Sequence, residues 1–176
     1  MIDRKLTRWS TLLFILAVLS GMQGVVAPVV LLVNGTPINL VRGSEVWSTT
    51  LQALSNTDGT LVLTLVVAPQ LAWLYAMVQV GLLALCYRRG EFFDRRATGR
   101  FVRIGVALGL ASVANSAVIP ILGYVLHARG VLPWLPDMPM FAAFDTSLAM
   151  GGAFFYIIGK IMQRGAELQD SESLTI

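Results

Sequence analysis

Four long apolar stretches, separated by polar segments, dominate the pattern of the chain. They cover residues 9–30, 69–87, 104–126 and 145–163. Each contains about nineteen residues or more, close to the length at which a helix crosses a bilayer core of ~30 Å. The pattern therefore predicts an all-α membrane protein with one domain, a four-transmembrane-helix bundle.

The polar segments between these stretches differ in kind. Residues 34–68 and 127–144 are rich in turn-forming residues, whereas residues 88–103 contain six arginines. Short loops rich in Lys and Arg stay in the cytoplasm. We therefore expect a cytoplasmic loop at 88–103, exported loops at 34–68 and 127–144, and a cytoplasmic tail at 164–176. On this topology only Arg42 and Arg129, of thirteen basic residues, lie outside, and both termini are cytoplasmic.

The first apolar stretch has an alternative interpretation as a cleaved signal peptide. Val25 and Ala27 are small enough to precede a cleavage site. Pro28 would then follow the cut directly, which disfavours cleavage. We therefore expect an uncleaved helix.

The first exported loop contains two stretches with strand character, residues 38–41 and 61–67. The alternative for the second is that the following helix begins at Leu61. Pro69 favours a helix that starts at residue 69, because proline fits the first turn of a helix and disrupts its interior. We therefore predict short strands in this loop and a second helix over 69–87.

Small residues form a stripe on the third predicted helix. Its members are Gly105, Gly109, Ser112 and Ser116, and the amide of Asn115 lies beside them. Small residues let another helix approach closely, and a buried amide in lipid needs a partner. We expect this face to pack against another helix, with Asn115 bonded across the contact.

Asp145 stands at the start of the last apolar stretch, and two interpretations apply. An intramembrane carboxylate would mark a proton or ion path. A helix N-cap would instead accept from the backbone N–H of Ser147 or Leu148. Counting about nineteen residues back from Arg164 reaches Asp145, which favours the cap.

Composition and motifs argue against several functions. Charged residues make up 13% of the chain, against about 25% in soluble proteins. The arginines adjoin apolar segments, where they meet anionic lipid headgroups, so we expect no direct nucleic-acid binding. Phosphate loops, metal-binding motifs and nucleophile elbows are absent from the sequence, and Cys86 and His127 are the only residues of their kinds. We expect no enzyme, cofactor or metal site.

Two stretches of the chain resemble the DUF2975 family of small bacterial four-helix membrane proteins. They are RGEFF (89–93) with RFVRIG (100–105), and the ending RGAELQDSESLTI (164–176). The ending departs from the family pattern at Asp170-Ser171, where two acidic residues are usual, and at Ile176, where valine is usual. The resemblance implies the bacterial cytoplasmic membrane. The family has no established activity, but its genes often stand beside one for a small helix-turn-helix regulator.

Three functions are compatible with these features. The first is a regulatory or adaptor protein that binds such a regulator through Arg95, Arg96, Arg100, Arg103, Glu167, Leu168, Gln169 and Asp170. The second is a small transporter, channel or peptide-immunity protein with polar groups Gln23, Gln79, Asn115 and Asp145. The third is a structural subunit that forms homo-oligomers through the Gly105 and Gly109 face. We favour the first, because the tail keeps the family ending beyond what topology requires.

Overall fold

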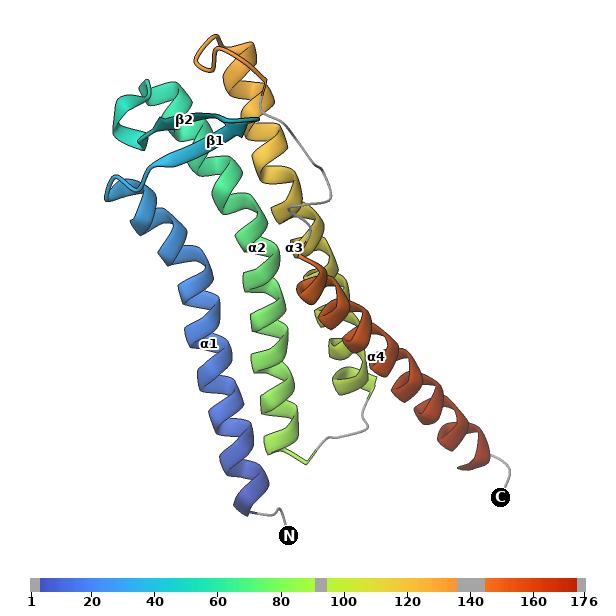
Figure 1. The fold of residues 1–176 in the computed structure, drawn as a ribbon. Coiled ribbons are helices and arrows are strands. Elements are labelled where there is room, and N and C mark those ends of the chain that lie inside the picture. Colours follow the sequence, from blue (N-terminus) through green and yellow to red (C-terminus); the bar gives the residue numbers. More distant parts are fainter. Residues whose placement is uncertain (1–3, 91–94, 136–144, 174–176) are drawn as a thin grey trace.

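Helices make up most of the chain, as expected. The computed structural model describes the backbone of residues 4–90, 95–135 and 145–173, and the side chains of 7–90, 95–135 and 145–168. Of these residues 81% are helical. The four helices are α1 (Arg4–Val33), α2 (Asn56–Arg88), α3 (Arg95–Ala128) and α4 (Thr146–Ser173) (Figure 1).

Three of the helices are long and apolar enough to cross a membrane. They are Thr7–Val33 of α1 and the whole of α2 and α3. In α4, Lys160 and Gln163 interrupt the apolar sequence, so this helix is less apolar than the other three. Length and composition therefore distinguish three candidate spans from a fourth helix of mixed character.

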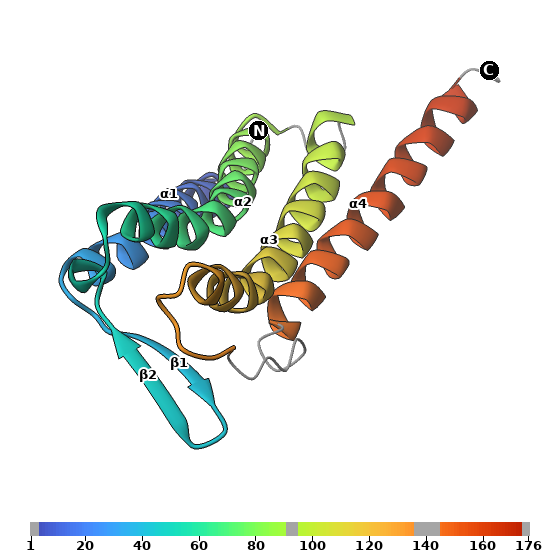
Figure 2. The ribbon, with the colours of Figure 1, turned by 90° about the horizontal axis from the view of Figure 1, so that it is seen from above.

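The helices are arranged in a row. α1 packs against α2, α2 against α3, and α3 against α4. The views from the side and from above agree on this order, and α4 slants away from the others toward its C-terminal end (Figures 1 and 2). The two outer helices, α1 and α4, consequently each have one main neighbour and leave much apolar surface exposed.

The predicted start of the second helix was wrong. α2 begins at Asn56 rather than at residue 69, and residues 61–67 are helical rather than a strand. Ser55 caps the helix, because its Oγ accepts from the backbone N–H of Asp58 at 3.2 Å. Pro69 lies buried inside α2. A strong cap and the thirteen helical residues before the proline outweigh the single backbone hydrogen bond that proline removes.

The predicted strand at 38–41 is confirmed, and it pairs with a strand later in the same loop. β1 (Ile38–Arg42) pairs antiparallel with β2 (Glu45–Thr49), and Leu40 lies opposite Trp47. Gly43 adopts a φ of 56° at the first position of the two-residue turn. Such tight hairpin turns need positive φ, which glycine adopts without steric cost.

The other helices also extend beyond the predicted bounds of 9–30, 104–126 and 145–163. α3 begins at Arg95 and α4 continues to Ser173, so much of the expected cytoplasmic loop and tail is helical. Arg, Ala, Glu, Leu and Gln make up more than half of the extensions at 95–103 and 164–173, and these residue types are good helix formers. Residues 91–94, 136–144 and 174–176 of the predicted loops and tail lie outside the described residues.

Asp145 is the N-cap of α4, as expected. The backbone N–H of Leu148 donates to Asp145 Oδ1 at 2.9 Å. The carboxylate is exposed at the helix start. This geometry argues against the alternative of an intramembrane carboxylate.

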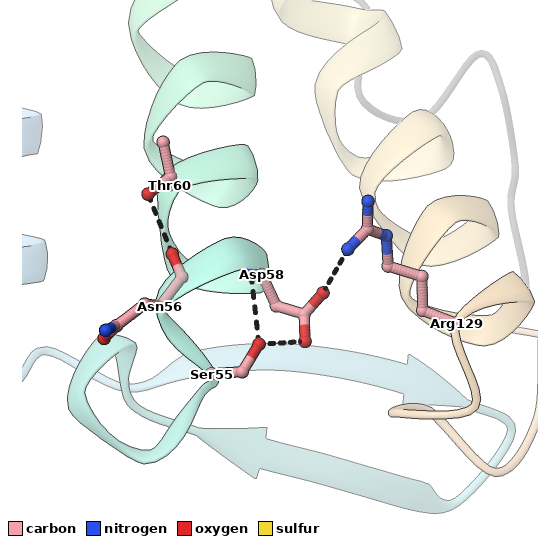
Figure 3. A network of polar contacts seen from close by, with 5 residues as sticks. All are labelled: Ser55, Asn56, Asp58, Thr60 and Arg129. Carbon is pink, nitrogen blue, oxygen red and sulfur yellow. Dashed lines mark hydrogen bonds and ion pairs between the residues drawn. The ribbon is translucent and has the colours of Figure 1, made fainter.

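The hairpin covers the ends of α2 and α3 with a small apolar core. Its buried members are Leu40, Val62, Leu122, Leu126 and Leu132. An ion pair reinforces the same end of the molecule: Arg129 Nη1 lies 3.0 Å from Asp58 Oδ1, with side chains 43% and 12% exposed. Ser55 Oγ donates to the other carboxylate oxygen at 2.6 Å (Figure 3). These contacts fix the start of α2 against the end of α3.

Removing the Ser55 cap tests this account of the start of α2. We expect Ser55→Ala to lower the free energy of unfolding by about 1 kcal/mol, because one helix N–H and one carboxylate oxygen lose their partner. The measurement is denaturant unfolding of the purified protein in detergent, followed by circular dichroism. Thr57→Ala, which removes an exposed hydroxyl from the same turn, is the matched control. Equal stability of the two variants would contradict the assignment of Ser55 as the cap.

Candidate functional site

The predicted cytoplasmic binding residues lie on two helices at the same end of the molecule. Arg95, Arg96 and Arg103 are exposed on the first turns of α3, and Arg100 is partly buried. The Nε of Arg100 is a buried donor without a partner among the described residues. The end of α2 and the start of α3 lie at the same end of the molecule as the start of α1 and the end of α4 (Figure 1). The arginines are therefore presented on a helix rather than on a loop.

The tail residues of the predicted site lie on the last turns of α4. Glu167 is exposed and Leu168 is 66% exposed. Gln169 and Asp170 lie in the helix, and their side chains are outside the described part. Both views place this end of α4 apart from the start of α3 (Figures 1 and 2). Within the described helices, the structure therefore places the first turns of α3 and the last turns of α4 apart.

The stripe of small residues on α3 is occupied by α4 of the same chain. A Cβ added to Gly105 would lie 2.5 Å from the backbone N of Tyr156 and 2.6 Å from the carbonyl O of Gly152. Ser112 Oγ donates to the carbonyl of Asp145 at 2.9 Å, and Ser116 Oγ donates to the Ser112 carbonyl at 2.8 Å. The contact is thus backbone against backbone.

The two glycines of that stripe differ in their surroundings. A Cβ on Gly109 would meet nothing within 4 Å, unlike one on Gly105. Because α4 covers Gly105, that part of the stripe is not available to a second copy of the chain. The sequence pattern alone treats the two positions as equivalent.

A polar groove opens between α1, α2 and α3. It has a volume of about 440 Å³. Its lining residues are Ser20, Gln23, Gly24, Ala27, Pro28, Gln70, Trp73 and Asn115. Gln70 Nε2 donates to Asn115 Oδ1 at 3.3 Å, which joins α2 to α3. Trp73 Nε1 donates to the Ser20 carbonyl at 3.3 Å, which joins α2 to α1.

Of the four polar residues named for the transport alternative, two line the groove and two do not. Gln23 and Asn115 both line it, whereas Gln79 and Asp145 do not. Gln79 is 5% exposed, and its Oε1 has no partner among the described residues. Gln70 and Trp73 were missed by the sequence analysis. A helix that starts at residue 69 would have placed both at the membrane surface rather than inside the span.

Within the described ranges, no three His, Cys, Asp or Glu side chains come together as metal ligands. His127 Nδ1 lies 3.0 Å from the Leu132 carbonyl, so it donates to that oxygen. Cys86 is buried in the contact between α2 and α3. His127 therefore bonds to the backbone of a loop, and Cys86 packs among apolar side chains.

Comparison with known proteins supplies no assignment. The chain matches no protein-family model, no curated protein and no solved structure. The resemblance to DUF2975 therefore stays a prediction.

The unequal surroundings of the two α3 glycines lead to a matched pair of substitutions. We expect Gly105→Ala to lower the free energy of unfolding by about 1 to 3 kcal/mol, because its methyl group would force the α4 backbone away. Gly109→Ala is expected to be neutral or to stabilise the helix by up to about 1 kcal/mol. Denaturant unfolding in detergent measures both. Equal destabilisation by the two changes would show that α4 does not pack as described.

Proposed function

We propose that the chain is a multi-pass protein of the bacterial cytoplasmic membrane, with four spans and both termini in the cytoplasm. The start of α1, the end of α2, the start of α3 with its arginines and the end of α4 lie at one end of the molecule, opposite the hairpin (Figure 1). The bias of Lys and Arg toward that end supports its cytoplasmic location. In α4, Met150, Phe154 and Ile157 offer exposed apolar surface to lipid, and Lys160 is close enough to the cytoplasmic end to reach the headgroups.

Accessibility of single cysteines tests this topology. In a Cys86→Ser background, we expect Ser44→Cys in the hairpin to react with a membrane-impermeant maleimide on spheroplasts. Ser171→Cys near the end of α4 is expected to react only after lysis, because α4 returns the chain to the cytoplasm. Labelling of both positions from outside would rule out α4 as a span.

On this topology, we propose that the protein is a membrane-bound regulatory or adaptor protein that binds a soluble cytoplasmic partner. The observation that carries the proposal is the length of α4, which continues as a helix for ten residues beyond Gln163 and slants away from α3 (Figure 1). An exposed helix with an apolar residue such as Leu168 suits docking into a groove of a partner. The exposed arginines of α3 add a positively charged surface nearby.

The partner that we propose is a small helix-turn-helix regulator. The resemblance to DUF2975 supports this choice, because genes of that family often adjoin one for such a regulator. Binding would keep the regulator at the membrane and away from DNA. This mechanism requires no chemistry from the chain itself.

Deleting residues 167–176 tests the adaptor function. Purification of the N-terminally tagged full chain in mild detergent is expected to recover a helix-turn-helix protein in near-equimolar amount, identified by mass spectrometry. The truncated chain should lose it, because the docking helix is gone, yet should insert normally. Arg95→Gln is expected to weaken recovery, while Arg8→Gln, an exposed arginine at the same end of the molecule, serves as its control. Undiminished recovery with the truncated chain would contradict the proposed site.

The polar groove favours a second function, the binding of a ligand inside the membrane. It brings Gln23, Gln70 and Asn115 together in one site. A helix does not need such polar residues in order to cross a membrane. This observation is consistent with the transport or peptide-immunity alternative.

A further inference from the structure

The polar groove between α1, α2 and α3 lies among lipid-facing side chains. On α1, Leu19, Met22 and Val26 flank it and are exposed. Gln23 is ten residues before the end of α1 at Val33, roughly 15 Å along the helix axis. On the proposed topology the groove therefore lies in the outer half of the bilayer and opens sideways into lipid.

The lining offers hydrogen-bonding groups that the protein itself does not use. The bond from Gln70 to Asn115 leaves Gln70 Oε1 and the Asn115 amide N–H groups available. The Gln23 side chain has no hydrogen bond to any described residue. Pro28 has no N–H, so the Gly24 carbonyl, four residues earlier, loses its partner in the helix. The groove thus presents both donors and acceptors to the lipid phase.

The lining contains no charged side chain, and this limits the ligand. A phosphate or carboxylate group would need Arg or Lys, and an ammonium group would need Asp or Glu. A purely apolar ligand would leave the amides without partners, which is costly in lipid. The complementary ligand is an uncharged molecule with groups that accept and donate hydrogen bonds.

Trp73 contributes its indole ring to the lining of the groove. Its indole N–H is held by the Ser20 carbonyl, so the ring orientation is fixed. Gly24 makes room for the ring, because a Cβ there would lie 2.5 Å from Trp73 Cδ1. Flat rings stack favourably on such an aromatic face. The volume, about 440 Å³, is within the range of small-molecule sites.

We propose that this groove binds the ring of a lipid-soluble quinone or quinol. Quinone carbonyls accept from the amide N–H groups of Asn115 and Gln23, and quinol hydroxyls donate to the Gly24 carbonyl. The ring stacks on Trp73, and the apolar tail leaves through the open side into lipid. Binding does not involve the cytoplasmic partner, so a chain lacking residues 167–176 is expected to bind as the full chain does.

Photolabelling of the full chain in lipid nanodiscs tests the proposal. An azido-ubiquinone probe is expected to label peptides of α1, α2 and α3 saturably, and decylubiquinone is expected to compete. The double variant Gln70→Leu/Asn115→Leu removes both partners of the amide pair, which spares the fold an unpaired amide. It should raise the half-saturating probe concentration about tenfold, since the head-group contact with Asn115 is lost.

Two further variants keep the test informative. Gln79→Leu removes the same side-chain type from the same helix outside the groove and should leave binding unchanged. Gln23→Leu removes an exposed amide without internal bonds and should weaken binding even where the double variant misfolds, as judged by circular dichroism. Labelling that is not saturable, is unaffected by these groove variants, or is displaced equally by decylbenzene or a lysophospholipid would overturn the proposal and leave a site for bulk lipid only.

Discussion

When two helices pack against each other in lipid, burying apolar side chains in their contact stabilises it little, because the lipid tails are equally apolar. This constraint explains how the helices of the chain pack. The three helix pairs meet at small or polar residues. Gly105 against Gly152 brings α3 and α4 into backbone contact. Gly21 and Gly24 admit side chains of α2 to the surface of α1. Between α2 and α3 the contact combines buried alanines with the amide pair in the groove. The small and polar positions thus decide which faces meet.

The two ends of the molecule follow a different rule, because they lie outside the lipid on the proposed topology. At the hairpin end, water surrounds the protein, so the burial of apolar side chains stabilises the fold. Leu40 and Leu132 are almost fully buried there, in the small apolar core under the hairpin. The ion pair of Asp58 with Arg129 fixes the same end. At the other end α4 diverges from its neighbour (Figure 1). The small apolar core and the ion pair join the ends of α2 and α3, while the opposite end leaves the last turns of α4 exposed, as the proposed docking of a partner requires.

The sequence predicted the number and approximate places of the helices, because apolar runs of spanning length are an unambiguous signal. The cap at Asp145 also followed from local chemistry. The start of α2 did not, because the rule that proline begins a helix competed with a cap at Ser55, fourteen positions earlier. That error concealed the groove: a helix that starts at residue 69 places Gln70 at its first turn, so its bond to Asn115 was not foreseen. Contacts between residues so far apart in the chain depend on helix register, which composition does not reveal.

The prolines inside α1 and α2 coincide with the groove. Pro28 lines it, and Pro69 immediately precedes Gln70. A proline in a helix interior costs about 3 kcal/mol, since it removes a hydrogen bond and crowds the preceding turn. In lipid the freed carbonyl has no bulk water to bond to, so it needs a partner from a neighbouring group or from a ligand. A ligand that donates to the Gly24 carbonyl offsets this cost. The Gly24 carbonyl and the amides that would bind such a ligand therefore lie at the same depth in the bilayer.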